Sequence, residues 1–219
     1  GVWCGNHSNP TLINVTIANN VSNNSSYTGG AVTAYGSDPT LINCITFNNF
    51  PNEIVLSYIG DGSSVSVSYS NIQGGQDSIV TNNNGTVTWG SGNIDIDPMF
   101  ADTANGNYHL LASSQLINAG HPDSTDSDGT IADIGAYPYL NNYSGPTWYI
   151  TEGGNDTTAT GASGDPFRSI QAGINFSSDD DSVTVASGTY VENINFRGRN
   201  IKVVGEDRET TIIDGNQSG

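Results

Sequence analysis

Basic residues are scarce in this chain of 219 residues, which has five Lys and Arg against 22 Asp and Glu and a formal net charge of −17. No Lys or Arg occurs before Arg168. Nucleic acids and anionic membrane surfaces are bound mainly through Lys and Arg, so this deficit argues against both as partners. The acidic excess favours solubility, cation binding and an extracellular or high-salt setting.

Cysteines and long apolar runs are also nearly absent. Cys4 and Cys44 are too few for a disulfide framework and lack the paired spacing of a metal site. They form either two buried thiols or one bridge. No apolar run approaches the ~20 residues that cross a bilayer, so we expect no membrane insertion.

Asn, Gly, Ser and Thr are abundant instead, which is typical of strand-and-turn proteins. Residues 9–20 recur as residues 38–49, and both copies contain Pro-Thr-Leu-Ile-Asn. Repeats of roughly 20 to 50 residues indicate solenoids, propellers or arrays, and short β-branched runs between turn residues exclude the helical kinds. The repeat therefore predicts a β-solenoid.

The apolar residues of each repeat indicate where the strand turns. Leu12 and Val15 are three positions apart rather than two, so the alternation breaks at Asn14, and the same break recurs at Asn43. We expect a corner at each Asn, with the amides of successive coils stacked in a ladder ~4.8 Å apart. N-glycosylation of Asn-x-Ser/Thr sequons is the alternative role for such residues, although a chain this rich in Asn, Ser and Thr contains many sequons by chance.

The repeat fades towards the middle of the chain. Residues 64–75 form a third, degenerate coil, and residues 86–89 begin a closing strand. Residues 93–139 are aperiodic, which is typical of the segment that covers the last coil of a solenoid. Residues 143–147 are predicted to form a linker.

A second unit follows this linker. Asp165, followed by a proline, predicts the start of a short helix near residues 166–176, whose apolar face would carry Phe167, Ile170 and Ile174. The strands expected around this helix cover residues 148–151, 183–186, 190–196, 200–204 and 211–214.

Two groups of segments resemble one known family. Residues 165–175 with 181–193 look like the amino-terminal cap and first coil of right-handed parallel β-helix repeat proteins of prokaryotic surfaces, which have the pectate-lyase-like architecture. The closing segment of that family is similar to residues 93–100, 114–120 and 133–137. The resemblance implies an all-β fold, a right-handed parallel β-helix (a single-stranded β-solenoid) with one short capping helix. It is specific for fold and says little about activity.

The family-like segments stand in the reverse of their usual order. Residues 1–142 resemble carboxy-terminal coils with a closing cap, and residues 148–219 resemble an amino-terminal cap with the first coils. We therefore expect residues 148–219 to be completed by residues 1–142 of the same or a neighbouring copy. A head-to-tail fibre, a repeat of a longer tandem chain and a permuted single helix all remain open.

Exposed strand edges at the two incomplete ends would drive head-to-tail joining of copies through a heterologous interface. The residues predicted at this assembly interface are Gly1, Val2, Trp3, Ile212, Ile213 and Gly219.

Polysaccharide lyases and hydrolases share this architecture, so catalytic residues were sought. A lyase needs a basic residue, and the close pair Arg197 and Arg199 flanks a glycine in what reads as a solvated turn. Asp95 and Asp97 are near enough for a hydrolase pair, but a proline follows them in a cap-like turn. Three histidines are scattered without metal-type spacing: His7, His109 and His121. We predict no catalytic residues.

An acidic segment near Gly129 is the best candidate for a metal site. Its side chains are Asp123, Asp126, Asp128 and Asp133, and hard oxygen ligands of this kind suit calcium. The spacing departs from an EF-hand and lacks the glutamate at the twelfth position. A calcium site is therefore predicted with Asx turns as the alternative.

Six aromatic residues could form a sugar-stacking face if they point outward, or could pack in the core: Trp3, Tyr27, Tyr35, Tyr58, Tyr69 and Trp89. We expect a non-catalytic extracellular or cell-surface structural protein, a β-helix subunit or repeat of a head-to-tail fibre, sheath or adhesive array. Copies of the chain itself are the expected partners. The alternatives are a carbohydrate-binding surface module, with polysaccharide as partner, and a degenerate polysaccharide lyase or hydrolase.

Overall fold

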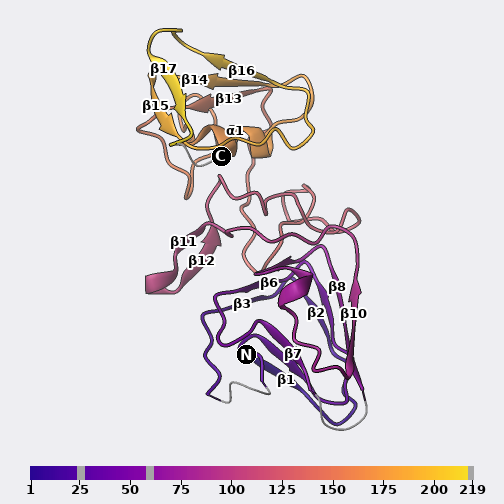
Figure 1. Cartoon of the computed structure of the whole chain (residues 1–219). Helices are drawn as coiled ribbons and strands as arrows, with labels where there is room; N and C mark the ends of the chain where they lie inside the picture. Colours follow the sequence, from indigo (N-terminus) through magenta and orange to yellow (C-terminus); the bar gives the residue numbers. More distant parts are fainter. Residues whose placement is uncertain (24–27, 58–61, 217–219) are drawn as a thin grey trace. The chain divides into compact units, whose positions relative to one another are not determined.

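The computed structural model describes residues 1–23, 28–57 and 62–216. Parallel strands stack as β-solenoid coils in each of its two parts, with about eight turns in all, and one short α-helix accompanies them within these residues (Figure 1). The predicted parallel β-helix with a single short helix is therefore confirmed. The chain divides into two compact units: unit 1 is Gly1–Pro98 with Asn118–Pro138, and unit 2 is Met99–Ile117 with Tyr139–Gly219.

Unit 1 contains three parallel sheets, to which successive coils contribute one strand each. Their strand orders are β1-β4-β7, β10-β8-β5-β2 and β3-β6-β9. A short 3-10 helix, Gln76–Ser78, lies between β9 and β10 in the sequence. The strands are β1 (Val2–Cys4), β2 (Thr11–Ile13), β3 (Thr16–Ala18), β4 (Val32–Ala34), β5 (Thr40–Ile42), β6 (Ile45–Phe47), β7 (Ile54–Leu56), β8 (Ser63–Ser68), β9 (Asn71–Ile72) and β10 (Gly85–Trp89).

The register of unit 1 follows the sequence repeat. Leu12 pairs with Leu41 across β2 and β5, a displacement of 29 positions, so the two copies of the repeat lie one above the other. Asn14 and Asn43 have φ angles of 55° and 53°, in the left-handed region that Asn tolerates better than most residues. Each Asn therefore turns the corner between two sheets, as predicted.

The predicted amide ladder connects the first two coils. Asn43 Nδ2 donates to Asn14 Oδ1 at 3.1 Å, and Asn20 Nδ2 donates to Asn49 Oδ1 at 2.9 Å. The first pair extends further, because the His121 backbone N–H donates to Asn43 Oδ1 at 2.7 Å. Asn43 is fully buried, so these hydrogen bonds satisfy an amide that would otherwise be costly to bury.

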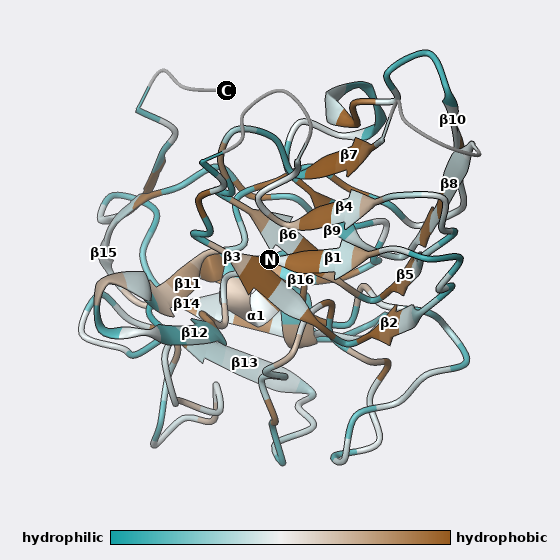
Figure 2. Cartoon of the chain, turned by 90° about the horizontal axis from the view of Figure 1, so that it is seen from below, coloured by the Kyte–Doolittle hydropathy of each residue, from teal (hydrophilic) through white to brown (hydrophobic). Residues whose placement is uncertain are grey.

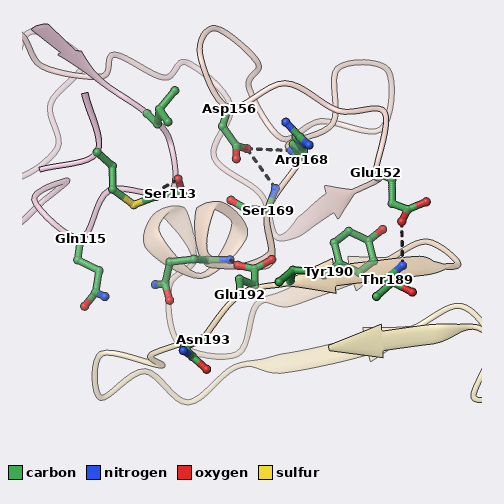
Figure 3. A pocket seen from close by; sticks show the side chains of 14 residues that line it. Ser113, Gln115, Glu152, Asp156, Arg168, Ser169, Thr189, Tyr190, Glu192 and Asn193 are labelled. Atoms are coloured by element: carbon green, nitrogen blue, oxygen red, sulfur yellow. Dashed lines mark hydrogen bonds between the residues drawn. The ribbon is translucent and has the colours of Figure 1, made fainter. Parts of the chain in front are cut away.

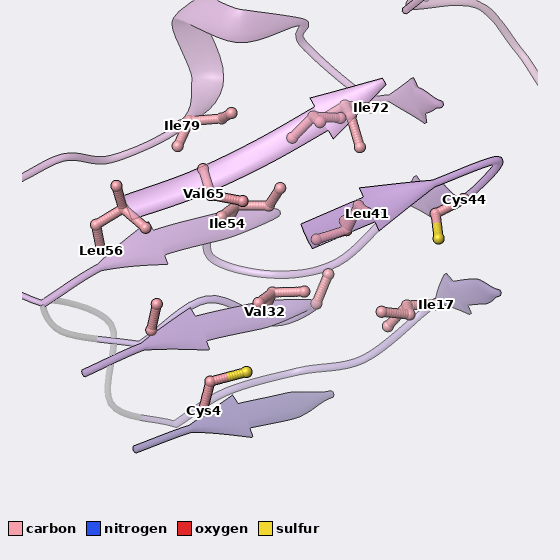
Figure 4. Packing of buried hydrophobic residues seen from close by; sticks show 13 residues of the cluster. Cys4, Ile17, Val32, Leu41, Cys44, Ile54, Leu56, Val65, Ile72 and Ile79 are labelled. Atoms are coloured by element: carbon pink, nitrogen blue, oxygen red, sulfur yellow. The ribbon is translucent and has the colours of Figure 1, made fainter. Parts of the chain in front are cut away.

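Aliphatic side chains and thiols fill the core of unit 1, stacked in rows across neighbouring strands (Figure 4). The hydropathy colouring shows β4 and β7 as apolar and much of the connecting backbone as hydrophilic (Figure 2). Cys4 and Cys44 are both buried free thiols, which decides the alternative left by the sequence. The buried cluster comprises Cys4, Ile17, Ala31, Val32, Ala34, Leu41, Cys44, Ile54, Leu56, Val65, Val67, Ile72 and Ile79.

The segment 118–138 packs onto the coils of unit 1. The Gly135 N–H donates to the Asn43 carbonyl at 2.9 Å, and the Ala136 N–H donates to Thr16 Oγ1 at 3.0 Å. Gly135 has a φ of 113°, and an added Cβ would lie 2.6 Å from Ile45 Cδ1. Only glycine combines this backbone conformation with so close an approach.

Unit 2 holds the remaining strands and the helix. Two parallel sheets have the orders β13-β14-β16 and β15-β17, and β11 pairs with β12 in an antiparallel hairpin. The elements are β11 (Phe100–Asp102), a 3-10 helix (Thr103–Asn105), β12 (Asn107–Leu110), β13 (Thr147–Ile150), α1 (Ile170–Phe176), β14 (Ser182–Val185), β15 (Gly188–Val191), β16 (Lys202–Gly205) and β17 (Thr211–Asp214).

Helix α1 begins later than the sequence predicted. Asp165 is not its N-cap, because Asp165 Oδ2 instead accepts the Thr160 N–H at 2.8 Å and closes a preceding loop. Phe167 still lies beside β13 in extended conformation, and the N-cap is Ser169, whose hydroxyl accepts the Ala172 N–H at 3.3 Å. The predicted apolar face is fully buried, although Phe167 contributes from outside the helix.

The strand expected over residues 190–196 is also shorter, because β15 ends at Val191. The next residue, Glu192, turns its carboxylate back to α1, where its two oxygens accept the N–H groups of Ile170 and Gln171 at 2.8 and 2.9 Å. Asn195 accepts the backbone N–H of Arg197 at 2.8 Å, which closes a turn where the strand was expected to continue.

Residues 99–117 belong to unit 2, whereas the sequence assigned them to the closing segment of residues 1–142. Asn175 of α1 explains this, because its Nδ2 donates to the carbonyls of Ala112 and Ser114 at 2.9 and 2.8 Å. The Ala112 N–H in turn donates to the Asp156 carbonyl at 2.7 Å. These buried contacts connect the segment to the helix, a pairing with no signal in the sequence.

Candidate functional site

The first coil of unit 1 ends in unpaired strand edges. Strands β1, β2 and β3 each stand last in their sheet, and no other strand in the described part of the chain pairs with their outer side. Some side chains at this end are incompletely covered: Val2 of β1, Leu12 of β2 and Val15 at the corner before β3 are only partly buried, whereas Cys4 and Ile17 are buried. The outward side chains of Trp3 and Ile13 are 61% and 53% exposed.

The last coil of unit 2 ends in the same way, with β16 and β17 at the outer side of their sheets. Ile213 pairs with Tyr190, which is 4% exposed, yet Ile213 itself is 46% exposed because nothing among the described residues covers it. A cavity of about 290 Å³ opens beside it. Six of the residues lining this cavity are Ile170, Val185, Val203, Gly205, Thr211 and Ile213.

The exposed edges of unit 1 lack two common protections against strand pairing, although each strand is only three residues long. Natural edge strands are blunted by charged side chains or proline, but β1, β2 and β3 contain neither. Indeed the sequence has no Asp, Glu, Lys or Arg before Asp38. In a chain with a net charge of −17, this end offers a neutral surface to which another coil can pair.

The residues predicted at the assembly interface fall on these two ends. Gly1, Val2 and Trp3 lie in or next to β1, and Ile212 and Ile213 lie in β17. Gly219 is outside the described residues.

The acidic residues predicted to bind calcium are engaged in turn hydrogen bonds. Asp126 Oδ2 accepts the Asp133 N–H at 2.8 Å, and Asp128 Oδ1 accepts the Thr130 N–H at 3.1 Å. Asp133 Oδ1 accepts the Asn118 N–H at 2.8 Å. In the described ranges, no three His, Cys, Asp or Glu side chains lie close enough together to hold a metal ion. The Asp128 contact has the spacing of an Asx turn, and the other two tie more distant parts of the segment together. These contacts satisfy carboxylate oxygens without a metal, as in the alternative to the calcium site, and calcium binding stays untested.

The sequence predicted that Arg197 and Arg199 lie in a solvated turn. In the structure both side chains instead donate hydrogen bonds to backbone carbonyls. Arg197 Nη1 donates to the Ile117 carbonyl at 2.8 Å, and Arg199 Nη1 donates to the Ile174 carbonyl in the last turn of α1. Burial lowers the pKa of the Arg199 guanidinium, and Asp179 opposes that shift. Both arginines therefore bind backbone carbonyls, and no pattern in the sequence predicts these contacts.

The other candidates for catalysis are exposed and dispersed. Asp95 Oδ1 accepts the Gly74 N–H at 3.0 Å in a turn next to exposed Asp97. His121 Nδ1 accepts the Asp123 N–H at 3.2 Å, and its ring lies edge-on to Tyr69. The exposed His7 and His109 lie in separate segments.

The aromatic residues do not form the proposed continuous face. Trp3 and Tyr35 stack with centroids 6.2 Å apart, whereas Tyr69 contacts His121 and Trp89 packs against the core. Tyr27 and Tyr58 are outside the described residues. Among the described residues of this set, Trp3 and Tyr35 stack on each other, with Trp3 exposed and Tyr35 half-buried.

A second cavity, of about 560 Å³, lies within unit 2 (Figure 3). Three carboxylates line it, and each already accepts backbone N–H groups: Glu192 those at the start of α1, Asp156 those of Arg168 and Ser169, and Glu152 that of Thr189. Burial raises the pKa of Glu192, and the neighbouring Asp156 adds to the shift. The sequence offered no signal for this cluster beyond acidic residues near strand ends.

A buried carboxyl in unit 1 was also missed. Glu53 is 4% exposed, and its oxygens accept the Asn49 N–H and Nδ2–H at 2.9 and 2.7 Å. Burial raises the pKa of Glu53, and these hydrogen bonds oppose the shift. These hydrogen bonds connect Glu53 to Asn49 of the amide ladder and indicate a structural role for the Glu53 carboxyl.

No helix in the described ranges is long and apolar enough to cross a membrane.

One known family is similar to part of unit 2. The family described as "Protein of unknown function (DUF1565)", which is associated with β-helix proteins, matches residues 152–198. The matched range contains α1, β14 and β15. No curated protein and no solved structure matches the chain. The similarity supports the parallel β-helix fold and specifies no activity.

Proposed function

We propose that this chain is a non-catalytic structural module that extends a β-solenoid by stacking its open coil ends on copies of itself, head to tail. The observation that carries the proposal is the exposure of inward-facing Ile213, although its partner in the previous coil is buried; the cavity beside it is lined by aliphatic side chains and by Asp207 and Arg208. A fibre, sheath or adhesive array at the cell surface is the setting that suits an acidic, Asn-rich and Gly-rich chain.

The unpaired strands supply the driving force. A strand edge presents unpaired N–H and C=O groups, and a parallel neighbour satisfies them. Stacking another coil would also bury Val203 and Ile213, and full burial of one such side chain stabilises by about 1.5 to 3 kcal/mol. Two different ends meet in this arrangement, so the interface is heterologous and generates open chains of copies.

Two neighbouring isoleucines provide a matched test. Ile213 lines the cavity and Ile212 does not, although the two are 46% and 48% exposed. We expect Ile213→Asp to weaken self-association at least about tenfold, because it replaces an apolar contact with a charge that must lose its water on association, and Ile212→Asp to change it much less. Light scattering after gel filtration over a range of concentrations, in ~0.15 M salt to screen the net charge, measures this.

Circular dichroism verifies that both variants remain folded, and negative-stain imaging shows whether the oligomers are linear. A wild-type chain that stays monomeric at the highest concentration contradicts the proposal. Equal effects of the two substitutions would show that the contact between copies does not lie at the cavity.

A carbohydrate-binding surface module is the second candidate, supported by the stacked Trp3 and Tyr35 rings. Sugars pack on exposed aromatic faces of this kind. A glycan array on wild type, with Trp3→Ala and the equally exposed Phe50→Ala as the test and control variants, checks it. Binding lost only in Trp3→Ala would support this candidate, and an array without signal would remove it.

A further inference from the structure

We propose that the cavity of about 560 Å³ in unit 2 binds an extended peptide that carries Lys or Arg and pairs with one edge of β15 (Figure 3). The main chain of the peptide would bond to that edge, and its basic side chains would contact the carboxylates around the cavity. The lining residues differ from those of the cavity beside Ile213, so this inference goes beyond the proposed function and does not depend on it.

The main chain of β15 bonds to β17 through alternate residues. The Gly188 N–H donates to the Thr210 carbonyl at 2.8 Å, on the side of β17. Neighbouring residues of a strand direct their N–H groups to opposite edges, so Thr189 and Val191 direct theirs away from β17. Both of these residues line the cavity. The edge of β15 opposite to β17 therefore faces the cavity.

This edge has hydrogen-bonding groups for an added strand. The Thr189 N–H donates to Glu152 Oε1 at 2.9 Å, which confirms the direction of the edge. Within the described residues, the Val191 N–H donates no hydrogen bond and the Thr189 carbonyl accepts none. Val191 is 64% exposed, so an incoming chain can reach it. Peptides that add to a sheet edge bind through such main-chain groups.

The charges around the cavity favour a basic partner. Its lining contains three carboxylates, from Glu152, Asp156 and Glu192, and one guanidinium, from Arg168. Figure 3 shows the carboxylates at separate positions, and no metal-binding group of three acidic side chains occurs in the described part of the chain. An extended ligand with several positive charges can contact separate carboxylates, whereas a single ion cannot.

Two of the carboxylates keep an oxygen for such a ligand. Asp156 Oδ1 accepts the N–H groups of Arg168 and Ser169 at 2.8 and 3.2 Å, and Glu152 uses Oε1. Asp156 Oδ2 and Glu152 Oε2 accept no hydrogen bond from the described residues. The bonds already made hold both carboxylates in place, which reduces the ordering cost when a basic side chain binds.

Apolar side chains form another part of the lining: Met99, Leu111 and Val191. Met99 and Val191 are 39% and 64% exposed. Exposed apolar side chains rimmed by polar groups commonly mark interaction sites. The aliphatic stem of Lys or Arg can pack on them while its charged end reaches a carboxylate. The lining thus suits both parts of a basic side chain.

The chain itself is a poor source of such a peptide. Residues 1–167 contain no Lys or Arg. Further on, the side chains of Arg197 and Arg199 bind backbone carbonyls of unit 2, and Lys202 lies within β16. A separate basic partner complements the net charge of −17, and opposite charges also accelerate association.

Two substitutions of Val191 test the pairing with β15. Val191→Pro removes the N–H that faces the cavity without removing a bond to β17, whereas Val191→Thr keeps this N–H. Two fluorescent hexapeptides, with Lys at odd or at even positions and Thr elsewhere, serve as probes of the full chain. We expect binding at least about tenfold weaker in Val191→Pro and changed less than about threefold in Val191→Thr, measured by fluorescence anisotropy.

A second pair of variants tests the charge. Glu206 is outside the cavity, and like Glu152 it accepts one backbone N–H, that of Ser187 at 3.0 Å. Glu152→Gln should weaken binding about three- to fivefold, and Glu206→Gln should change it little. Ile213→Asp should bind the probes as the wild type does. Hexapeptides with Glu in place of Lys should not bind, and raising the salt from about 0.05 to about 0.5 M should weaken binding of the Lys peptides.

Circular dichroism verifies that each variant folds. If Val191→Pro does not fold, N-methylation of the peptide backbone tests the same hydrogen bonds and should weaken binding about tenfold. Selective loss in Val191→Pro, or on N-methylation, together with loss in Glu152→Gln supports the proposal. It is overturned if neither Lys peptide binds the wild type at about 1 mM, if the Glu peptides bind equally well, or if removing the N–H groups has no effect. Peptide binding by a wild type that stays monomeric would contradict the proposed function alone.

Discussion

The cores of the two units contain different kinds of side chain. Unit 1 stacks aliphatic side chains and thiols in rows, each row repeated from coil to coil. Unit 2 groups aromatic rings around α1: Trp148 and Phe167 stack with centroids 6.3 Å apart, and Phe167 and Phe176 stack at 5.3 Å. A repeated core tolerates the loss of one member better than a cluster whose rings all contact one another, and the following predictions probe this contrast.

The largest effect is expected at Trp148, which is 2% exposed and donates its Nε1–H to Asp181 Oδ2 at 2.9 Å. Trp148→Ala should lower the free energy of unfolding by about 3 to 5 kcal/mol, because it empties the centre of the aromatic cluster. Hydrogen exchange read by mass spectrometry should show the loss in β13 and β14. Equal loss in β4 and β5 would mean that the two units unfold together.

A smaller effect is expected in the amide ladder of unit 1. Asn43→Asp keeps the acceptor for the His121 N–H but removes the donor to Asn14, and it places a charge at a fully buried position. We expect a loss of about 2 to 3 kcal/mol in urea unfolding. Asn48, which is exposed and donates its Nδ2–H to Asn19 Oδ1 at 2.6 Å, supplies the control, and Asn48→Asp should cost much less. Similar losses in both variants would show that burial does not set the strength of the ladder.

A pH-dependent effect is expected from Glu53. Its pKa is raised above 4.5 in the folded chain, so on raising the pH the unfolded chain releases this proton first. The free energy of unfolding therefore falls as pH rises from about 4.5 until it passes the folded pKa. Glu53→Gln should flatten this part of the profile in urea titrations, and the exposed Asp95→Asn should leave it in place. Parallel profiles for wild type and Glu53→Gln would contradict the assignment.

The smallest effect is expected at the acidic turn around Gly129. Excess EDTA should leave the thermal midpoint unchanged, because Asp126, Asp128 and Asp133 accept backbone N–H groups of their own loop or segment. A ligand that binds only the folded state would raise the midpoint by mass action. A rise on adding calcium that EDTA reverses, and that Asp126→Asn removes, would establish the calcium site.

The sequence predicted unit 1 well because its signal is repeated. The 29-residue displacement gave the pairing of Leu12 with Leu41, and the break in alternation located the corners at Asn14 and Asn43. Every such position was visible twice, so local propensity and long-range pairing agreed. The fold class of the whole chain followed from this agreement.

Unit 2 was predicted less accurately because its decisive contacts occur once. In the sequence, Asp165 and the proline after it have the pattern of an ordinary helix start. In the structure, the Asp165 carboxylate accepts the Thr160 N–H instead, and Ser169 is the N-cap. The attachment of residues 99–117 depends on one buried amide, Asn175.

The coils of one sheet differ in length, although their strands stay in register. Thr11, Thr40, Ser66 and Thr88 lie on successive coils and are separated by 29, 26 and 22 residues. The surplus residues are accommodated in the turns, so insertions and deletions there need not disturb the packed rows. Gly75, with a φ of 64° and no atom near its outward side, marks one such turn. The molecule is thus a permissive scaffold, in which peptides for display could be inserted and coils could diverge in evolution without redesign of the interior.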